Sequence, residues 1–195
     1  MARWEPNARG RLERAALELF VERGFAETTV PAITARAGLT TRTFFRHFAD
    51  KREVLFAVED EAPTMVAGLL ADAPASLGPM ALIAYGLETR AADLEDRREY
   101  LRTRRTVIQA DNGLRERELR KVAELSDAIA EGFRSRDKDE LTSALAAQIA
   151  VTTFGIAIGR WLDQDGNQPL ADLVRDTLGT LQAITADPVE QSRVV

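Results

Sequence analysis

Two short segments around Gly38 constrain the fold of this chain more than any other feature. Thr29 is a good helix N-cap, and Pro31 follows in the first turn, where a missing backbone N–H costs little. Gly38 has the backbone freedom to end this helix and turn sharply. Thr40 can then cap a second helix, in which Phe44 shares a face with another phenylalanine four residues on. The pattern predicts two helices joined by a tight turn within residues 28–48.

Such a pair is typical of a helix-turn-helix, whose second helix lies in a DNA major groove. Phe44 and Phe48 would anchor this helix, while Arg42 and its polar neighbours face outward. Two helices around a glycine also occur in proteins that never bind DNA, so the motif alone leaves both interpretations open.

The flanking sequence favours the DNA-binding interpretation. Asn7 precedes an amphipathic helix that ends near Gly24 and can support the motif. After the motif, Asp50 has the spacing of a capping box and predicts a fourth helix carrying Val54, Leu55 and Val58. Pro63 is expected to kink or interrupt that helix.

Residues 9–58 resemble the N-terminal domain of the tetracycline-repressor (TetR) family of regulators. The resemblance rests on Ala15 to Phe20, Gly24-Phe25, Thr28 to Val30, Ile33, Ala37-Gly38 and His47 to Lys51. Spacing, capping and aromatic positions agree together, which makes the match specific. Together, the motif and the resemblance single out the DNA-binding residues Thr29, Thr40, Thr41, Arg42, Thr43, Phe45, Arg46, His47 and Lys51.

By this resemblance, Thr29, Thr43, His47 and Lys51 match positions that commonly contact phosphates, whereas Thr41 and Arg42 face bases. Many family members carry at position 45 a tyrosine that binds a phosphate, and Phe45 cannot make that hydrogen bond. Position 42 is often glycine in the family. Arg42 adds a forked donor, for which we favour guanine O6 and N7 over a phosphate clamp.

Composition argues against an enzyme and places the positive charge in the motif region. The chain has no cysteine and one histidine, so neither a zinc site nor a Ser-His triad is expected, and no metal or cofactor. Residues 1–55 carry a net charge of +3 and residues 56–195 one of -8, within a total of -5. No signal peptide begins the chain and charges interrupt every apolar stretch, so we expect a cytoplasmic protein without a membrane segment.

The remaining sequence predicts an all-α chain with a larger helical domain after the motif. Helices are expected near residues 79–94, 96–110, 114–133, 141–162 and 170–184. The expected domains are a DNA-binding domain at 1–52 and a helical ligand-binding and dimerisation domain at 53–187, followed by a flexible tail at 188–195.

The two most apolar helices, near 141–162 and 170–184, are candidates for a homodimer interface. Family resemblance favours packing against a second copy, and the alternative is a central helix buried within one subunit. The interface candidates are Ala147, Val151, Gly155, Ile158, Gly159, Leu173, Leu178 and Leu181.

The resemblance to the TetR family implies a small-molecule ligand in the C-terminal domain. Large side chains at helical spacing either line its cavity or form ordinary core. These candidates are Met80, Tyr85, Tyr100, Phe133, Phe154 and Trp161. The arginine cluster between Arg97 and Arg105 would bind an anionic ligand or, alternatively, form a solvated face paired with nearby carboxylates.

The sequence therefore predicts a sequence-specific regulator of transcription. It would be a homodimeric repressor that binds a palindromic operator in double-stranded DNA and is released by a hydrophobic or amphipathic ligand. Two alternatives stay open: a transcriptional activator of the same family, and a helical protein-interaction module without specific DNA binding.

Overall fold

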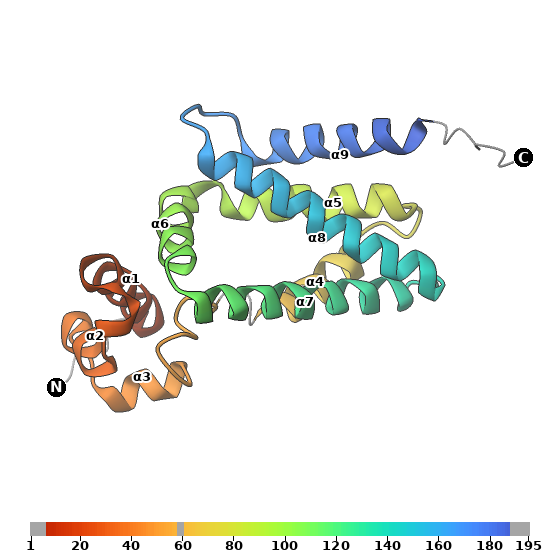
Figure 1. Ribbon diagram of the computed structural model, residues 1–195. Helices are drawn as coiled ribbons and strands as arrows, with labels where there is room; N and C mark the ends of the chain where they lie inside the picture. Colours follow the sequence, from red (N-terminus) through yellow and green to blue (C-terminus); the bar gives the residue numbers. More distant parts are fainter. Residues whose placement is uncertain (1–6, 58–60, 188–195) are drawn as a thin grey trace, which may run out of the picture. The chain divides into compact units, whose positions relative to one another are not determined.

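The structure, a computed structural model, describes residues 7–57 and 61–187, and all the regular secondary structure within these ranges is helical. The prediction of an all-α chain is confirmed. In chain order the helices are α1 (Ala8–Glu27), α2 (Val30–Ala37), α3 (Thr41–His47), α4 (Ala62–Asp72), α5 (Pro79–Leu94), the short 3-10 helix η2 (Glu95–Arg97), α6 (Arg98–Gln109), α7 (Asn112–Arg134), α8 (Glu140–Asp163) and α9 (Leu170–Ala186). Figure 1 labels the α-helices.

The chain divides into two compact units. The first holds residues up to 65 together with 99–125, and the second holds residues 66–98 and those from 126 onward. This division differs from the boundary expected after residue 52, because Leu55 and Phe56 join the core of the first unit, together with Val107, Ile108 and Leu114 from α6 and α7. The expected tail at 188–195 lies outside the described residues.

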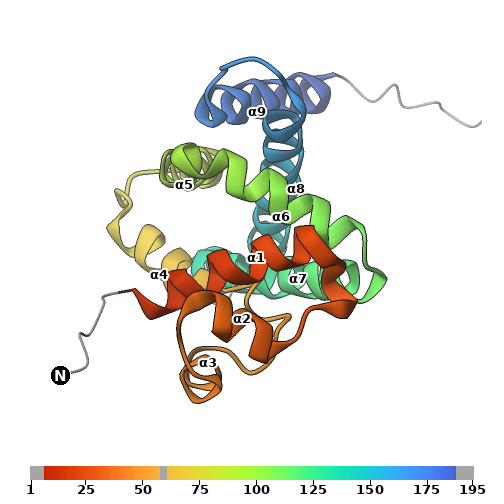
Figure 2. The ribbon, with the colours of Figure 1, turned by 90° about the vertical axis from the view of Figure 1, so that its left-hand side faces the viewer.

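Helices α1, α2 and α3 pack against one another in the first unit (Figure 2). The fully buried side chains of Leu12, Leu19, Ile33 and Phe44 supply the centre of this core. The Asn7 side chain accepts the Gly10 N–H and caps α1. The predicted end of the first helix is also visible, since regular helical geometry is interrupted at Gly24, where φ is 81°.

The expectation of a fourth helix opening at Asp50 is wrong. Asp50 Oδ1 does accept the N–H groups of Arg52 and Glu53, at 2.7 and 3.2 Å. The segment 51–57 nevertheless forms turns, and α4 begins only at Ala62. The side chains at 54–57 are all buried, so this turn segment packs into the core. Val58 lies outside the described residues.

Pro63 does not interrupt α4. It is the second residue of that helix, where the absent N–H would have had no helical acceptor.

In the second unit, α5, α8 and α9 pack against one another (Figure 1). Arg98 closes the α8–α9 connection by donating to the carbonyls of Trp161 (3.0 Å), Gln164 (2.5 Å) and Gly166 (2.8 Å). Glu95 accepts the first N–H of α9, from Leu170, at 3.0 Å. These contacts satisfy helix ends that would otherwise lack hydrogen-bond partners.

Helix α8 corrects the expectation that charges interrupt every apolar stretch. Among the described residues, this 24-residue helix is long and apolar enough to cross a membrane by length and composition alone. Its apolar character has another role in the second unit, since Ala146, Ala150, Ala157 and Trp161 are buried there.

Candidate DNA-binding site

The turn between α2 and α3 is formed by the helix caps and the glycine that the sequence predicts. Thr29 Oγ1 accepts the Ala32 N–H at 3.3 Å and caps α2. Gly38 follows with φ 63°, a left-handed conformation that glycine adopts without strain. Thr40 Oγ1 accepts the Thr43 N–H at 3.1 Å and caps α3. The predicted caps and glycine turn are confirmed.

Helix α3 is buried on one face and open on the other. Phe44 is 0% exposed and Phe48, which ends the helix, is 4% exposed, so the two predicted anchors are confirmed. Their ring centroids are 5.5 Å apart. Thr43 is half-buried, and the exposed candidates here are Thr40, Thr41, Arg42, Phe45, Arg46 and His47.

The exposed cations of α3 are free to meet an anionic partner. Within the described part of the chain, neither Arg42 nor Arg46 forms an ion pair or a side-chain hydrogen bond. Partial burial, followed by the positive charges of Arg46 and Arg9, lowers the pKa of His47 below its usual value. This shift favours the neutral imidazole, whereas a nearby phosphate would favour the protonated form.

Lys51 has a structural role that the sequence did not reveal. Its ammonium donates to the carbonyls of Phe25 (2.7 Å), Ala26 (3.0 Å) and Thr28 (2.8 Å), and lies 4.4 Å from the Phe25 ring centroid. An ammonium has three N–H donors, and here each has a carbonyl acceptor. Lys51 thus holds the segment that leads into Thr29, the N-cap of α2.

Three further arginines donate to backbone carbonyls of the first unit. Arg9 donates to the Ala57 carbonyl at 2.7 Å, and Arg11 to the Ala37 carbonyl at 2.5 Å. Arg104 is 8% exposed, donates to the Leu55 carbonyl at 2.6 Å and lies 5.2 Å from the centroid of a phenylalanine ring. Arg104 was expected in an anion-binding cluster or on a solvated face, and it fits neither expectation.

The six ligand candidates differ in burial and in the unit to which they belong. Phe133 and Trp161 are buried in the second unit, whereas Tyr100 packs against the core of the first. Met80 and Phe154 are half-buried, and Tyr85 is exposed. The burial of Phe133 and Trp161 agrees with the alternative that these two residues belong to the ordinary core.

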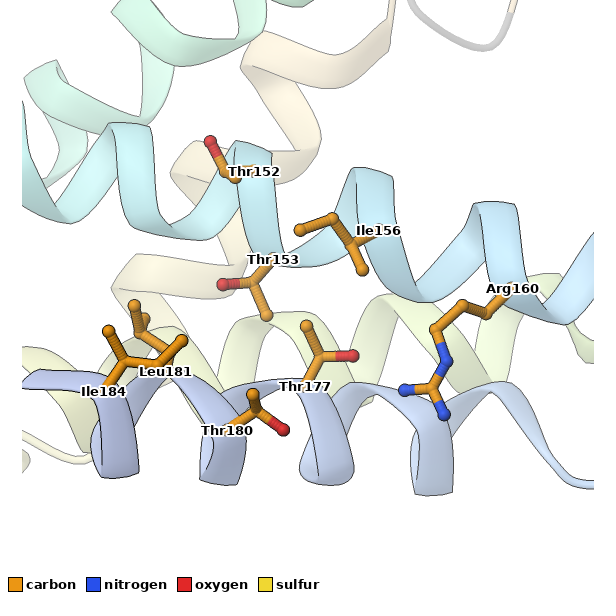
Figure 3. Close-up of a pocket in the computed structure, with 8 residues that line it drawn as sticks. All are labelled: Thr152, Thr153, Ile156, Arg160, Thr177, Thr180, Leu181 and Ile184. Carbon is orange, nitrogen blue, oxygen red and sulfur yellow. The ribbon is translucent and has the colours of Figure 1, made fainter.

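An open pocket of about 210 Å³ lies between α8 and α9 (Figure 3). Its lining residues are Thr152, Thr153, Ile156, Arg160, Thr177, Thr180, Leu181 and Ile184. Pockets for drug-sized ligands hold roughly 300 to 1,000 Å³, so this one is too small for such a molecule. None of the six ligand candidates lines it.

The dimer candidates divide by burial. Ala147, Leu173 and Leu178 are 1%, 2% and 6% exposed, because they pack inside the second unit, and they do not reach its surface. Val151, Ile158, Gly159 and Leu181 are half-buried, and Gly155 is exposed. The sequence also placed Ile156 and Ile184 on these two helices, and they are 50% and 67% exposed.

The fold and the exposed basic face of α3 define a helix-turn-helix DNA-binding protein. Residues 13–58 match the family of bacterial regulatory proteins known as the tetR family, and residues 79–186 match the MftR C-terminal domain of tetR-type regulators. The chain belongs to the tetR family of transcriptional regulators, as the resemblance at residues 9–58 predicted.

Named relatives and solved structures agree with this assignment. The chain is 28% identical over 164 residues to the HTH-type transcriptional regulator TcmR of Streptomyces glaucescens, which covers 80% of this chain and 72% of TcmR. It is 39% identical over 74 residues to an HTH-type transcriptional repressor of Mycobacterium tuberculosis, a match that spans 37% of this chain and 39% of that protein.

Two solved structures share the fold. The SmeT–triclosan complex has a TM-score of 0.61 at 24% identity and covers 96% of this chain and 94% of its own. FadR of Thermus thermophilus in complex with lauroyl-CoA has a TM-score of 0.55 at 22% identity. The match covers 96% of this chain and 98% of the FadR chain.

Proposed function

We propose that this regulator is a homodimeric repressor that binds a palindromic operator and releases it when a hydrophobic or amphipathic ligand binds. One observation carries the DNA-binding part of the proposal. Helix α3 turns Phe44 into the core and leaves Thr41, Arg42 and Arg46 exposed. Within the described residues, neither arginine has an ion-pair partner. Such a face suits the base edges and phosphates of a major groove.

Selection of bound sequences from a random duplex pool at moderate salt tests the DNA-binding proposal. We expect a palindrome with half-sites about 34 to 36 Å apart, the spacing of one helical turn that a two-fold dimer reads. Enrichment of a single half-site would contradict the dimeric mode, and no enrichment would contradict specific binding by the free protein.

The exposed surface of α8 and α9 supports a dimer through these helices. Ile156 and Ile184 are exposed there, and Gly155 and Gly159 have no heavy atom within 4 Å of an added Cβ position. Small residues beside exposed apolar ones allow another helix to approach closely. Contact with a second copy would remove these isoleucines from water.

Sedimentation of a charged variant tests this interface. Ile156→Glu places a carboxylate in the proposed contact, and we expect it to shift the protein toward monomer. Val21→Glu makes the same change at an exposed aliphatic residue of α1, 59% exposed, and should leave the assembly unchanged. If both variants sediment as wild type does, α8 is not the interface.

The proposed ligand class is supported by two related proteins, whose solved structures hold triclosan and lauroyl-CoA. A ligand that prefers one arrangement of the dimer weakens DNA binding by its differential affinity, and about 1 to 3 kcal/mol gives a 5- to 150-fold change. Fluorescence anisotropy of a labelled operator, titrated with lauroyl-CoA or triclosan as probes, measures this release. Unchanged anisotropy with both probes would argue against the proposed ligand class. The proposed location is the cytoplasm, where the chromosome lies.

A further inference from the structure

Phe45 is a large apolar side chain on the open face of α3. It is 56% exposed, whereas its neighbour Phe44 is 0% exposed. The two ring centroids are 5.4 Å apart and the ring planes meet at 83°, so the buried ring supports the exposed one edge to face. Phe45 therefore presents apolar surface to solvent from a defined position.

The neighbours of Phe45 connect it to the DNA-binding face. Thr41 and Arg42 precede it by four and three residues, a spacing that places side chains on the same side of a helix. Both are exposed. Arg46 and His47 follow directly and are also exposed, so cationic or titratable side chains surround this ring along the helix.

The chemistry of the side chain limits what it can contact. A phenyl ring has no hydrogen-bond donor or acceptor, so it can neither bind a phosphate nor pair with a polar base edge. The major groove offers one apolar group, the C5 methyl of thymine, which phenylalanine contacts in known readout. Single exposed hydrophobic residues are common on protein surfaces, but this one lies within the predicted base-reading helix.

We propose that Phe45 reads a thymine in each operator half-site by packing its ring against the C5 methyl group. This inference rests on the proposed DNA-binding function and specifies one recognised base. A tyrosine at this position could donate a hydrogen bond to a phosphate. Phe45 cannot make that bond, and its ring instead favours thymine over the other bases.

The expected loss of binding corresponds to the free energy gained by burying one methyl group. Removal of that methyl should weaken binding about fourfold per half-site, the fold-change that corresponds to about 0.8 kcal/mol. Removal in both half-sites of a palindrome should weaken binding about fifteenfold, because distant sites contribute additively.

The test replaces each operator thymine in turn by deoxyuridine, which lacks only the methyl group. Wild type, Phe45→Ala and Phe45→Tyr are titrated against every such duplex, using the operator recovered by selection. We expect wild type to be sensitive at one thymine per half-site. Phe45→Ala should lose that sensitivity, and Phe45→Tyr, which keeps the ring, should retain it. Because Phe45 is exposed, both variants should melt close to wild type, which circular dichroism checks.

Two results would overturn the inference. One is an equal uracil penalty in wild type and Phe45→Ala, which would assign the methyl contact to another residue. The other is the absence of any uracil-sensitive thymine in an operator that wild type binds. Failure of the proposed function itself looks different, since wild type would then retain no operator from the pool.

Discussion

Replacement of Lys51 by methionine removes an ammonium group while keeping an apolar stem of similar length. The ammonium donates to the carbonyls of Phe25, Ala26 and Thr28, of which the first and third bonds are partly buried and the second is exposed. Hydrogen bonds to a charged group contribute roughly 1.5 to 3 kcal/mol each. Water replaces the exposed bond at little cost, so the two others give a loss of about 3 kcal/mol at the lower value.

Thermal unfolding followed by circular dichroism measures this loss. For a chain of this size, about 2 to 4 °C in Tm accompanies each kcal/mol, which gives a decrease of about 6 to 12 °C. Arg52→Met is the matched control, because Arg52 is the next residue and its side chain is 56% exposed. An exposed ion pair contributes about 0 to 1 kcal/mol. Equal Tm values for the two variants would refute the tethering role of Lys51.

The same variant separates tethering from a phosphate contact. The family resemblance implies that Lys51 contacts DNA, and loss of one phosphate contact lowers the slope of log K against log salt by about 0.9. Operator binding is therefore measured at a temperature where the variant is folded. A lower slope with uniform weakening across sequences would support a phosphate contact. An unchanged slope would indicate that Lys51 stabilises the fold and does not contact DNA.

Three further predictions concern the motif. Arg42→Ala should cost about 1 to 3 kcal/mol of binding free energy and relax selectivity at one base position in repeated selection; equal loss on all sequences would contradict base readout. Since the pKa of His47 is lowered in the free protein and a phosphate favours the charged form, operator affinity should rise as pH falls from 8 to 6. His47→Gln should remove that part of the pH dependence, and an identical profile would argue against the contact. Gly38→Ala should lower the free energy of unfolding by about 1 to 2 kcal/mol, because φ is 63° there and a Cβ disfavours this left-handed conformation. Denaturant titration measures the loss, and an unchanged midpoint would contradict this reasoning.

Local signals were sufficient wherever a helix end depends on its own residues. Thr29 and Thr40 cap α2 and α3, and Gly38 turns the chain between them, as their side chains and backbone preferences predict. The same reasoning failed after Asp50. Its carboxylate caps the following N–H groups, but the segment 51–57 forms turns, and the side chains at 54–57 are buried in the core.

Hydrophobic periodicity located α8 and α9 without revealing which apolar residues face inward. Ala147 and Leu173 lie inside the second unit, while Ile156 and Ile184 are exposed on its surface. An apolar stripe has the same period whether it meets its own subunit or a second copy. Only packing distinguishes the two.

The sequence by itself determined the helical class, the helix-turn-helix and the family, because capping, glycine and aromatic positions act over a few residues. Only the tertiary structure decided the roles of Lys51 and Arg104. The Lys51 ammonium meets carbonyls 23 to 26 positions earlier in the chain, and Arg104 meets one 49 positions earlier. A long flexible cation can bind a phosphate, a ligand or a backbone carbonyl with equal local plausibility. Its partner is chosen by the fold, which brings distant carbonyls within reach of the charge.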